Sequence, residues 1–145
     1  MKLKVLGTGA LSIALLSFTP FSFAEKDVVG TWKMDAKSVT KMVKVAIDKA
    51  VEANPAVADQ IEENKDKIVE VIEGIRVNIK ADHTYETTTP QNTSTGKWVM
   101  ANKDHAIVFT KSDGTVRRDS ILESTATVLK TINGSLKDTI SYVHP

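Results

Sequence analysis

The spacing of apolar residues after residue 75 constrains the fold of this chain more than any other feature. Apolar and polar side chains alternate there with a period of two, as in Ile75, Val77 and Ile79. Turn signals such as Asp113-Gly114 and Asn133-Gly134 interrupt the alternation at short intervals. Short strands joined by tight turns favour an antiparallel meander. A meander with one apolar face must cover it or curl around it, and a closed barrel leaves no exposed edge.

Before residue 75, a helical segment interrupts the strands. Residues 30–34 are predicted to form a first strand, followed by a helical insertion over residues 37–74, where apolar residues are spaced three and four apart. Ser38 is a candidate helix cap, and Asn54-Pro55 separates two helices, because Asn suits a cap and Pro suits a first helical turn. We therefore expect a helical hairpin inserted after the first strand of a barrel.

The first 24 residues have the layout of a secretory signal peptide. Lys2 and Lys4 form a basic start, an apolar stretch follows, and Ser22-Phe23-Ala24 fits a cleavage site. The apolar stretch is short for a bilayer, so we expect cleavage after Ala24 rather than a membrane anchor. The expected mature protein is a single domain, residues 25–145, and is periplasmic or secreted.

Composition excludes several classes of function. Cysteine is absent, so the chain has no disulfide framework and no thiolate metal site. Two of the 19 basic residues, Lys2 and Lys4, belong to the leader, which leaves 17 basic against 18 acidic residues and a net charge of −1. A chain with this net charge lacks the excess of basic residues that binding to nucleic acid or to an anionic membrane requires. We expect neither partner.

The order of several short motifs carries a family resemblance. The motifs are Gly30-Thr31-Trp32-Lys33, Ile79-Lys80-Ala81-Asp82-His83-Thr84-Tyr85, Gly96-Lys97-Trp98, Ile107-Val108-Phe109 and Asp113-Gly114. Together they resemble exported bacterial lipocalin-like domains of the calycin group, and the first strand with its helix pair is similar to fatty-acid-binding proteins. The resemblance implies a mostly β (α+β) fold, an antiparallel lipocalin-like barrel of about eight strands, shaped as a cup for a small apolar molecule. The last strand lacks the Arg-x-Tyr lipid-carboxylate motif, so a fatty acid is not implied.

Curling of the strands would bring inward side chains together as a pocket for a small apolar or amphipathic molecule. Alternation places one of Arg117 and Arg118 on the face of Val116 and Leu122, which we expect to be inside. A buried guanidinium needs a partner, either a ligand carboxylate or an internal group such as Tyr85, Glu86 or Asp119. The same side chains are also what a filled barrel core needs. The predicted ligand-binding residues are Trp32, Met42, Ile47, Val77, Ile79, Tyr85, Trp98, Met100, Phe109 and Arg118.

Catalytic and metal-binding patterns are weak. Asp82-His83 and Asp104-His105 repeat an Asp-His pair at two predicted turns, which would suit zinc or copper if both turns lay at one barrel end. Asp and His are also ordinary turn residues, and we expect no metal and no cofactor. There is no cysteine and no Gly-x-Ser-x-Gly elbow to supply a nucleophile. We therefore do not expect an enzyme.

Two functions remain open. The first is an exported, non-catalytic binding protein for a small hydrophobic or amphipathic molecule. The alternative is a protein-binding module, such as an exported inhibitor or an envelope assembly factor, with a filled barrel or a cystatin-like curved sheet. The volume of the interior separates the two, since a filled barrel with an exposed apolar patch favours a protein partner.

Overall fold

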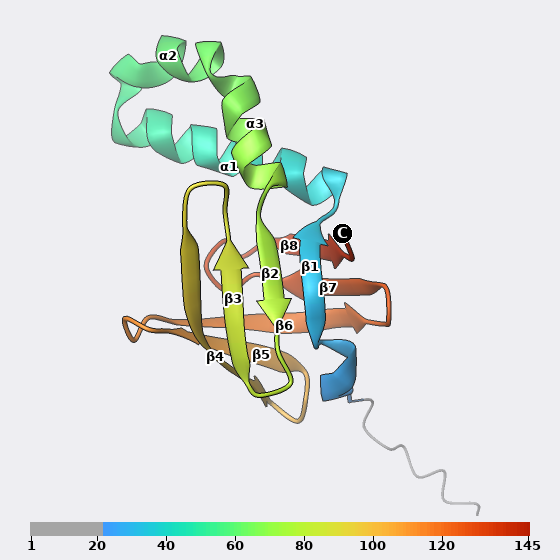
Figure 1. The fold of residues 1–145 in the computed structure, drawn as a ribbon. Helices are drawn as coiled ribbons and strands as arrows, with labels where there is room; N and C mark the ends of the chain where they lie inside the picture. Colours follow the sequence, from blue (N-terminus) through green and yellow to red (C-terminus); the bar gives the residue numbers. More distant parts are fainter. Residues whose placement is uncertain (1–21) are drawn as a thin grey trace, which may run out of the picture.

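The computed structural model describes residues 22–145, in which eight antiparallel strands close into a barrel (Figure 1). Each strand pairs with the next along the chain, and the first pairs with the last. The mostly β barrel of about eight strands with a helical insertion is therefore confirmed, whereas the predicted signal peptide lies outside the described residues except for its last three. The strands are β1 (Gly30–Met34), β2 (Arg76–Ile79), β3 (Thr84–Thr88), β4 (Thr93–Ala101), β5 (Ala106–Lys111), β6 (Val116–Ser124), β7 (Val128–Ile132) and β8 (Thr139–Val143).

A helical arm is inserted between β1 and β2, as the spacing predicted. Figure 1 shows α1 lying across the end of the barrel where β1 ends and β2 begins, with α2 farther from the sheet. Asn54 caps the turn after α1, because its Oδ1 accepts a hydrogen bond from the Ala56 N–H at 3.2 Å. The helical arm is interrupted a second time at Asn64. The elements of the arm are α1 (Ala36–Ala53), the 3₁₀ helix η2 (Pro55–Val57), α2 (Ala58–Glu63) and α3 (Lys65–Glu73).

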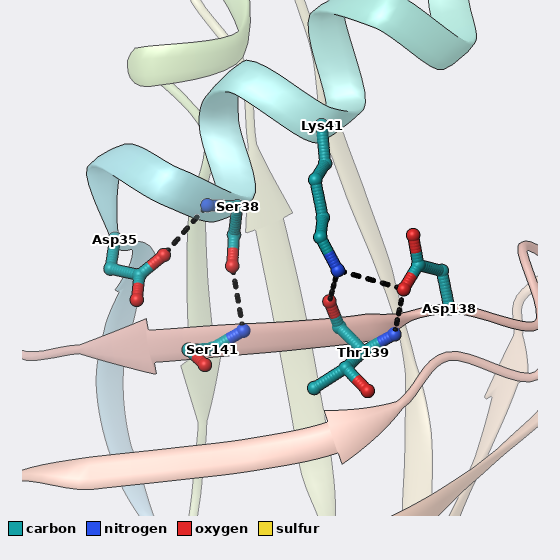
Figure 2. Close-up of polar contacts among 6 residues, drawn as sticks. All are labelled: Asp35, Ser38, Lys41, Asp138, Thr139 and Ser141. Atoms are coloured by element: carbon teal, nitrogen blue, oxygen red, sulfur yellow. Dashed lines mark hydrogen bonds and ion pairs between the residues drawn. The ribbon is translucent and has the colours of Figure 1, made fainter.

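Polar contacts fasten the first turns of α1 to β8 (Figure 2). Asp35, not the predicted Ser38, caps the helix, since its Oδ1 accepts a hydrogen bond from the Ser38 N–H at 2.7 Å. The Ser38 hydroxyl is free to accept from the Ser141 N–H at 2.8 Å. Lys41 Nζ donates to Asp138 Oδ1 at 2.8 Å, and this bond holds the pKa of Asp138 below its usual range. The N-terminal half of α1 is therefore tied to the sheet.

The apolar side chains form two clusters. One fills the barrel and contains Trp32 and Trp98, both almost completely buried. Their indole N–H groups donate to backbone carbonyl groups at 2.8 and 2.9 Å, so neither polar end is unsatisfied. The second cluster lies between the helices and the barrel end, where Met34 and Ile140 meet side chains from α1 and α3, such as Val43. Trp32 and Met34 share the inner face of β1, as the period-two alternation of residues 30–34 predicts.

The opposite end of the barrel is covered by the segment that precedes β1. A 3₁₀ helix, η1 (Glu25–Asp27), leads into Val28, which is fully buried in the barrel cluster. Phe23 belongs to the same cluster and packs edge-on against His105, with ring centroids 5.7 Å apart. The expected cleavage after Ala24 would remove Phe23, so processing at that bond would take one side chain out of this core.

The sequence predicts a polar loop over residues 90–95 and a last strand over residues 136–143, and both boundaries differ in the structure for local reasons. The turn after β7 is longer than a two-residue hairpin, because Asn133 Oδ1 accepts from the N–H groups of Ser135 and Leu136 at 3.0 and 3.1 Å. The last strand therefore begins at Thr139 rather than at Leu136. β4 begins at Thr93, inside the predicted polar loop, because residues 93–97 pair with the threonine-rich β3.

Substitution of Gly96 tests how tightly neighbouring strands pack in the barrel wall. A Cβ at this position would collide with the Thr110 carbonyl oxygen and lie 2.7 Å from Tyr85 Cε1. We expect Gly96→Ala to lower the free energy of unfolding, measured by chemical denaturation, by about 3 kcal/mol. Gly114 is the control: it has a φ of +86° but no atom within 4 Å of a Cβ. Gly114→Ala should cost only about 1 kcal/mol, and a smaller loss for Gly96→Ala would contradict the packing.

Candidate functional site

A cavity of about 10 Å³ lies inside the barrel, which is about the space that one water molecule needs. The rest of the interior is filled by side chains, as is usual for a barrel of eight strands. Most of the cavity wall is apolar, and four side chains give it polar groups. The apolar lining residues are Trp32, Val77, Ile79, Ile107, Phe109 and Leu129, and the polar ones are Arg117, Asp119, Thr131 and Tyr142.

Arg117 is the cation of this site. Its guanidinium lies over the ring of Phe109, 4.7 Å from the centroid, and its Nε lies 3.1 Å from Asp119 Oδ1. That distance makes an ion pair, but the buried Nε–H is not aimed closely enough to form a hydrogen bond. The Arg117 side chain as a whole is 34% exposed. It therefore extends between the cavity and solvent.

The prediction that Arg118 faces inward is wrong. Asp119 is buried, so alternation along β6 puts Arg117 on the inner face and Arg118 on the outer face. Val116 and Leu122, which were expected inside, are 62% and 48% exposed. The prediction failed because both faces of β6 mix polar and apolar side chains: Val116 and Leu122 lie outside, and the Arg117–Asp119 ion pair lies on the inner face.

Two buried polar groups at the cavity lack a hydrogen-bond partner. Thr131 is 1% exposed, and its Oγ1 accepts no hydrogen bond from, and donates none to, any residue of 22–145. The Nε of Arg117 is the other group. Asp119 is satisfied, because its Oδ1 accepts from the Gly134 N–H at 2.9 Å. The cavity therefore faces a hydroxyl with no partner and a guanidinium N–H that has an ion-pair partner but no hydrogen bond.

Tyr142 connects the cavity to the helical cover. It lies opposite Leu129 on β7 and Met34 on β1, and it packs against both apolar clusters. Burial raises the pKa of its phenol to about 12, and the charge of Arg117 partly offsets this effect. Burial also raises the pKa of Tyr85. The phenol of Tyr142 is neutral over the whole range in which the protein would work.

The structure separates the predicted ligand-binding residues into groups. Four line the cavity: Trp32, Val77, Ile79 and Phe109. Tyr85, Trp98 and Met100 belong to the barrel cluster without lining the cavity, and Met42 and Ile47 pack in the cluster beneath the helices. Sequence reasoning missed the lining residues of the last two strands, although their period-two alternation was the signal for them. These residues are Leu129, Thr131 and Tyr142.

The histidines His83 and His105 lie in the β2–β3 and β4–β5 turns, at the same barrel end. Each packs against an aromatic ring, and His83 Nε2 also lies 3.5 Å from Glu25 Oε1. In the described part of the chain, no group of three or more His, Cys, Asp or Glu side chains is placed to hold a metal ion. The geometry thus gives the two-histidine hypothesis no ligand set.

Comparisons with known proteins add little to this geometry. Neither a family model nor a curated protein matches the sequence. The structure is similar to the crystal structure of a DUF4847 family protein from Bacteroides vulgatus, with 16% identity and a TM-score of 0.48, covering 80% of this chain and 92% of that one. A likeness at this level carries no argument about function. No helix among residues 22–145 is long and apolar enough to span a bilayer.

The unpaired hydroxyl of Thr131 predicts an unusual response to substitution. Thr131→Val keeps the shape of the side chain and removes the unsatisfied group, so it should raise the free energy of unfolding by about 1 kcal/mol. Thr125 is the control, since its Oγ1 accepts from the Val128 N–H at 3.0 Å. Thr125→Val should lower the free energy of unfolding by about 1 kcal/mol. If Thr131→Val were as destabilising as Thr125→Val, the Thr131 hydroxyl would have a partner.

The raised pKa of Tyr142 predicts alkaline destabilisation. A phenol with a pKa of about 12 in the folded protein and about 10 when unfolded favours the folded state in its neutral form. Its contribution to stability is therefore complete below about pH 10 and is lost between about pH 10 and about pH 12. The ultraviolet titration of a Tyr85→Phe variant isolates Tyr142, and Tyr142→Phe should flatten the pH profile of stability there. A Tyr142 midpoint near pH 10 would contradict this burial.

Proposed function

We propose that this protein is an exported, lipocalin-like binding protein that is not an enzyme and takes a small amphipathic molecule into its barrel. The observation that supports this most is the pair of unsatisfied groups, Arg117 Nε and Thr131 Oγ1, at one cavity in an apolar interior. Buried polar groups in folded proteins nearly always have a partner. A hydroxyl with no partner and a guanidinium N–H with no hydrogen bond, at one cavity, favour a partner that comes from outside the chain.

The chemistry of the lining residues defines the ligand class. The terminal amino groups of Arg117 form no hydrogen bond with the described residues, so they are free to donate to an anionic or carbonyl head group. Thr131 adds a hydroxyl that both donates and accepts. The rings of Trp32 and Phe109 form an apolar surface beside these groups. A molecule with a polar acceptor at one end and an apolar body suits this arrangement.

Entry of such a ligand requires the barrel to open, because pockets for small molecules usually enclose about 300–1,000 Å³. The helical cover is the element suited to move. Its first turns are hydrogen-bonded to β8, but α3 meets the barrel end through apolar contacts such as Ile72 with Ile140. Apolar contacts are non-directional, so this part of the cover can shift at the cost of few hydrogen bonds, such as the one that Arg76 on β2 donates to the Glu73 carbonyl group at 2.6 Å. Export in this proposal depends on the layout of residues 1–24.

Titration with anilinonaphthalene sulfonate, an anionic amphipathic dye, tests the proposal. We expect saturable dye fluorescence with energy transfer from the barrel tryptophans, and about tenfold weaker binding to Arg117→Gln, which removes the head-group donor. Lys97→Gln is the control, because Lys97 is an exposed cation on the outer face of β4. Equal binding by both variants, or no saturable signal from the folded protein, would contradict ligand binding in the barrel.

The nearly filled interior gives the second candidate, a protein-binding module, support of its own. Exposed apolar side chains lie on the outer faces of β4 and of the adjacent strands β6 and β7, and they offer a partner an apolar surface. They are Val99, Val116, Leu122 and Ile132. A photo-cross-linker at Leu122 should then give one discrete adduct in cells, whereas one at Lys49 on α1 should give none. Diffuse labelling from both positions would contradict a specific partner.

A further inference from the structure

A groove of about 350 Å³ lies outside the barrel, between β6 and the turn that joins β7 to β8. Three cationic side chains line it: Arg117, Arg118 and Lys137. Two hydroxyl-bearing residues, Ser120 and Ser135, lie among them. Val116 and Ile132 give the groove an apolar part. It is therefore concave, strongly basic and partly apolar.

Two of the three cations of this groove, Arg118 and Lys137, have no counter-charge in the described chain, whereas Arg117 pairs with Asp119. Within residues 22–145, neither Arg118 nor Lys137 forms an ion pair or a side-chain hydrogen bond. The two carboxylates nearest in sequence are committed elsewhere. Asp119 is buried inside the barrel, and Asp138 pairs with Lys41 at 2.8 Å. Arg118 and Lys137 are therefore available to an anion from outside.

Backbone contacts hold the groove in shape. Gly134 lies so close to β6 that a Cβ there would collide with the Arg118 carbonyl oxygen, and its N–H donates to Asp119 at 2.9 Å. The Lys137 N–H donates to the Asn133 carbonyl group at 2.8 Å. Lys137 has a φ of +59°, a conformation that is strained for a residue with a side chain. The turn therefore fixes the backbone of Lys137 beside β6 before any ligand arrives, which reduces the backbone entropy lost on binding.

We propose that this groove binds a phosphate monoester, with the phosphate between Arg118 and Lys137 and the organic part against Val116 and Ile132. Arginine binds phosphate through two parallel N–H donors, and lysine adds a compact point charge. Two uncompensated cations in one small hollow suit a compact dianion, whereas a nucleic acid needs basic residues along an extended stripe. The site lies on the outer surface and does not depend on ligand binding inside the barrel.

Calorimetric titration of the full-length protein with phenyl phosphate at low ionic strength tests this site. We expect saturable binding that weakens about tenfold in Arg118→Gln and in Lys137→Gln. Lys103→Gln is the matched control, because Lys103 is an exposed turn lysine with a φ of +52° at the opposite end of the barrel. No saturable binding, or the same loss in Lys103→Gln, would overturn the proposal. Circular dichroism confirms that each variant is folded.

The phosphate monoester has two possible sources, and a second arm separates them. Vesicles of phosphatidylcholine with phosphatidic acid present a lipid phosphate monoester, and vesicles of phosphatidylcholine alone do not. Sedimentation with the first kind only, lost in Arg118→Gln, assigns the site to a lipid head group. Binding of phenyl phosphate without sedimentation assigns it to a soluble ester. Vesicle binding that Arg118→Gln and Lys137→Gln leave unchanged would count against the site.

Discussion

The pairing of β1 with β8 closes the barrel, and every inward side chain depends on it. β1 has five residues, of which the first three pair with β2 and only Lys33 and Met34 pair with β8. The Asp35 N–H extends this seam by donating to the Ser141 carbonyl group at 2.9 Å. The Ser141 N–H in turn donates to Ser38 in α1. The helix α1 therefore reinforces the short β1–β8 seam as well as covering the barrel end. If this seam opened, the edges of β1 and β8 would be exposed.

Closure of the barrel also determines which of the adjacent residues Arg117 and Arg118 faces the interior and which faces the outside. Because side chains alternate along β6, Arg117 joins Asp119 inside the barrel while Arg118 projects outward. The inner arginine faces an apolar cavity with an unpaired hydroxyl from Thr131. The outer one faces a basic groove beside Lys137. One strand thereby presents two recognition chemistries, an amphipathic one inside and an anionic one outside, separated by the thickness of the barrel wall.

Much of the fold could be predicted from local patterns, and much of the site could not. Alternation after residue 75, the helical spacing of residues 37–74 and the shared face of Trp32 and Met34 are local properties, and they specified the strands and the insertion correctly. Arg118 was misplaced because β6 carries apolar side chains outside, and only pairing with β5 and β7 decides which face turns inward. In the sequence, Thr131 looks like an ordinary polar strand residue, because only closure of the barrel buries its side chain. Whether the interior was hollow depended on packing among all eight strands.

The most direct test of ligand binding inside the barrel is a nuclear magnetic resonance titration with anilinonaphthalene sulfonate, which follows the side chains of the cavity. The account predicts saturable shifts at Arg117 Nε–H, the Thr131 methyl group and the Trp32 indole N–H, with Lys103 and its turn unaffected. Shifts confined to outward residues such as Val99 and Leu122, with the Arg117 and Thr131 signals unchanged, would contradict it.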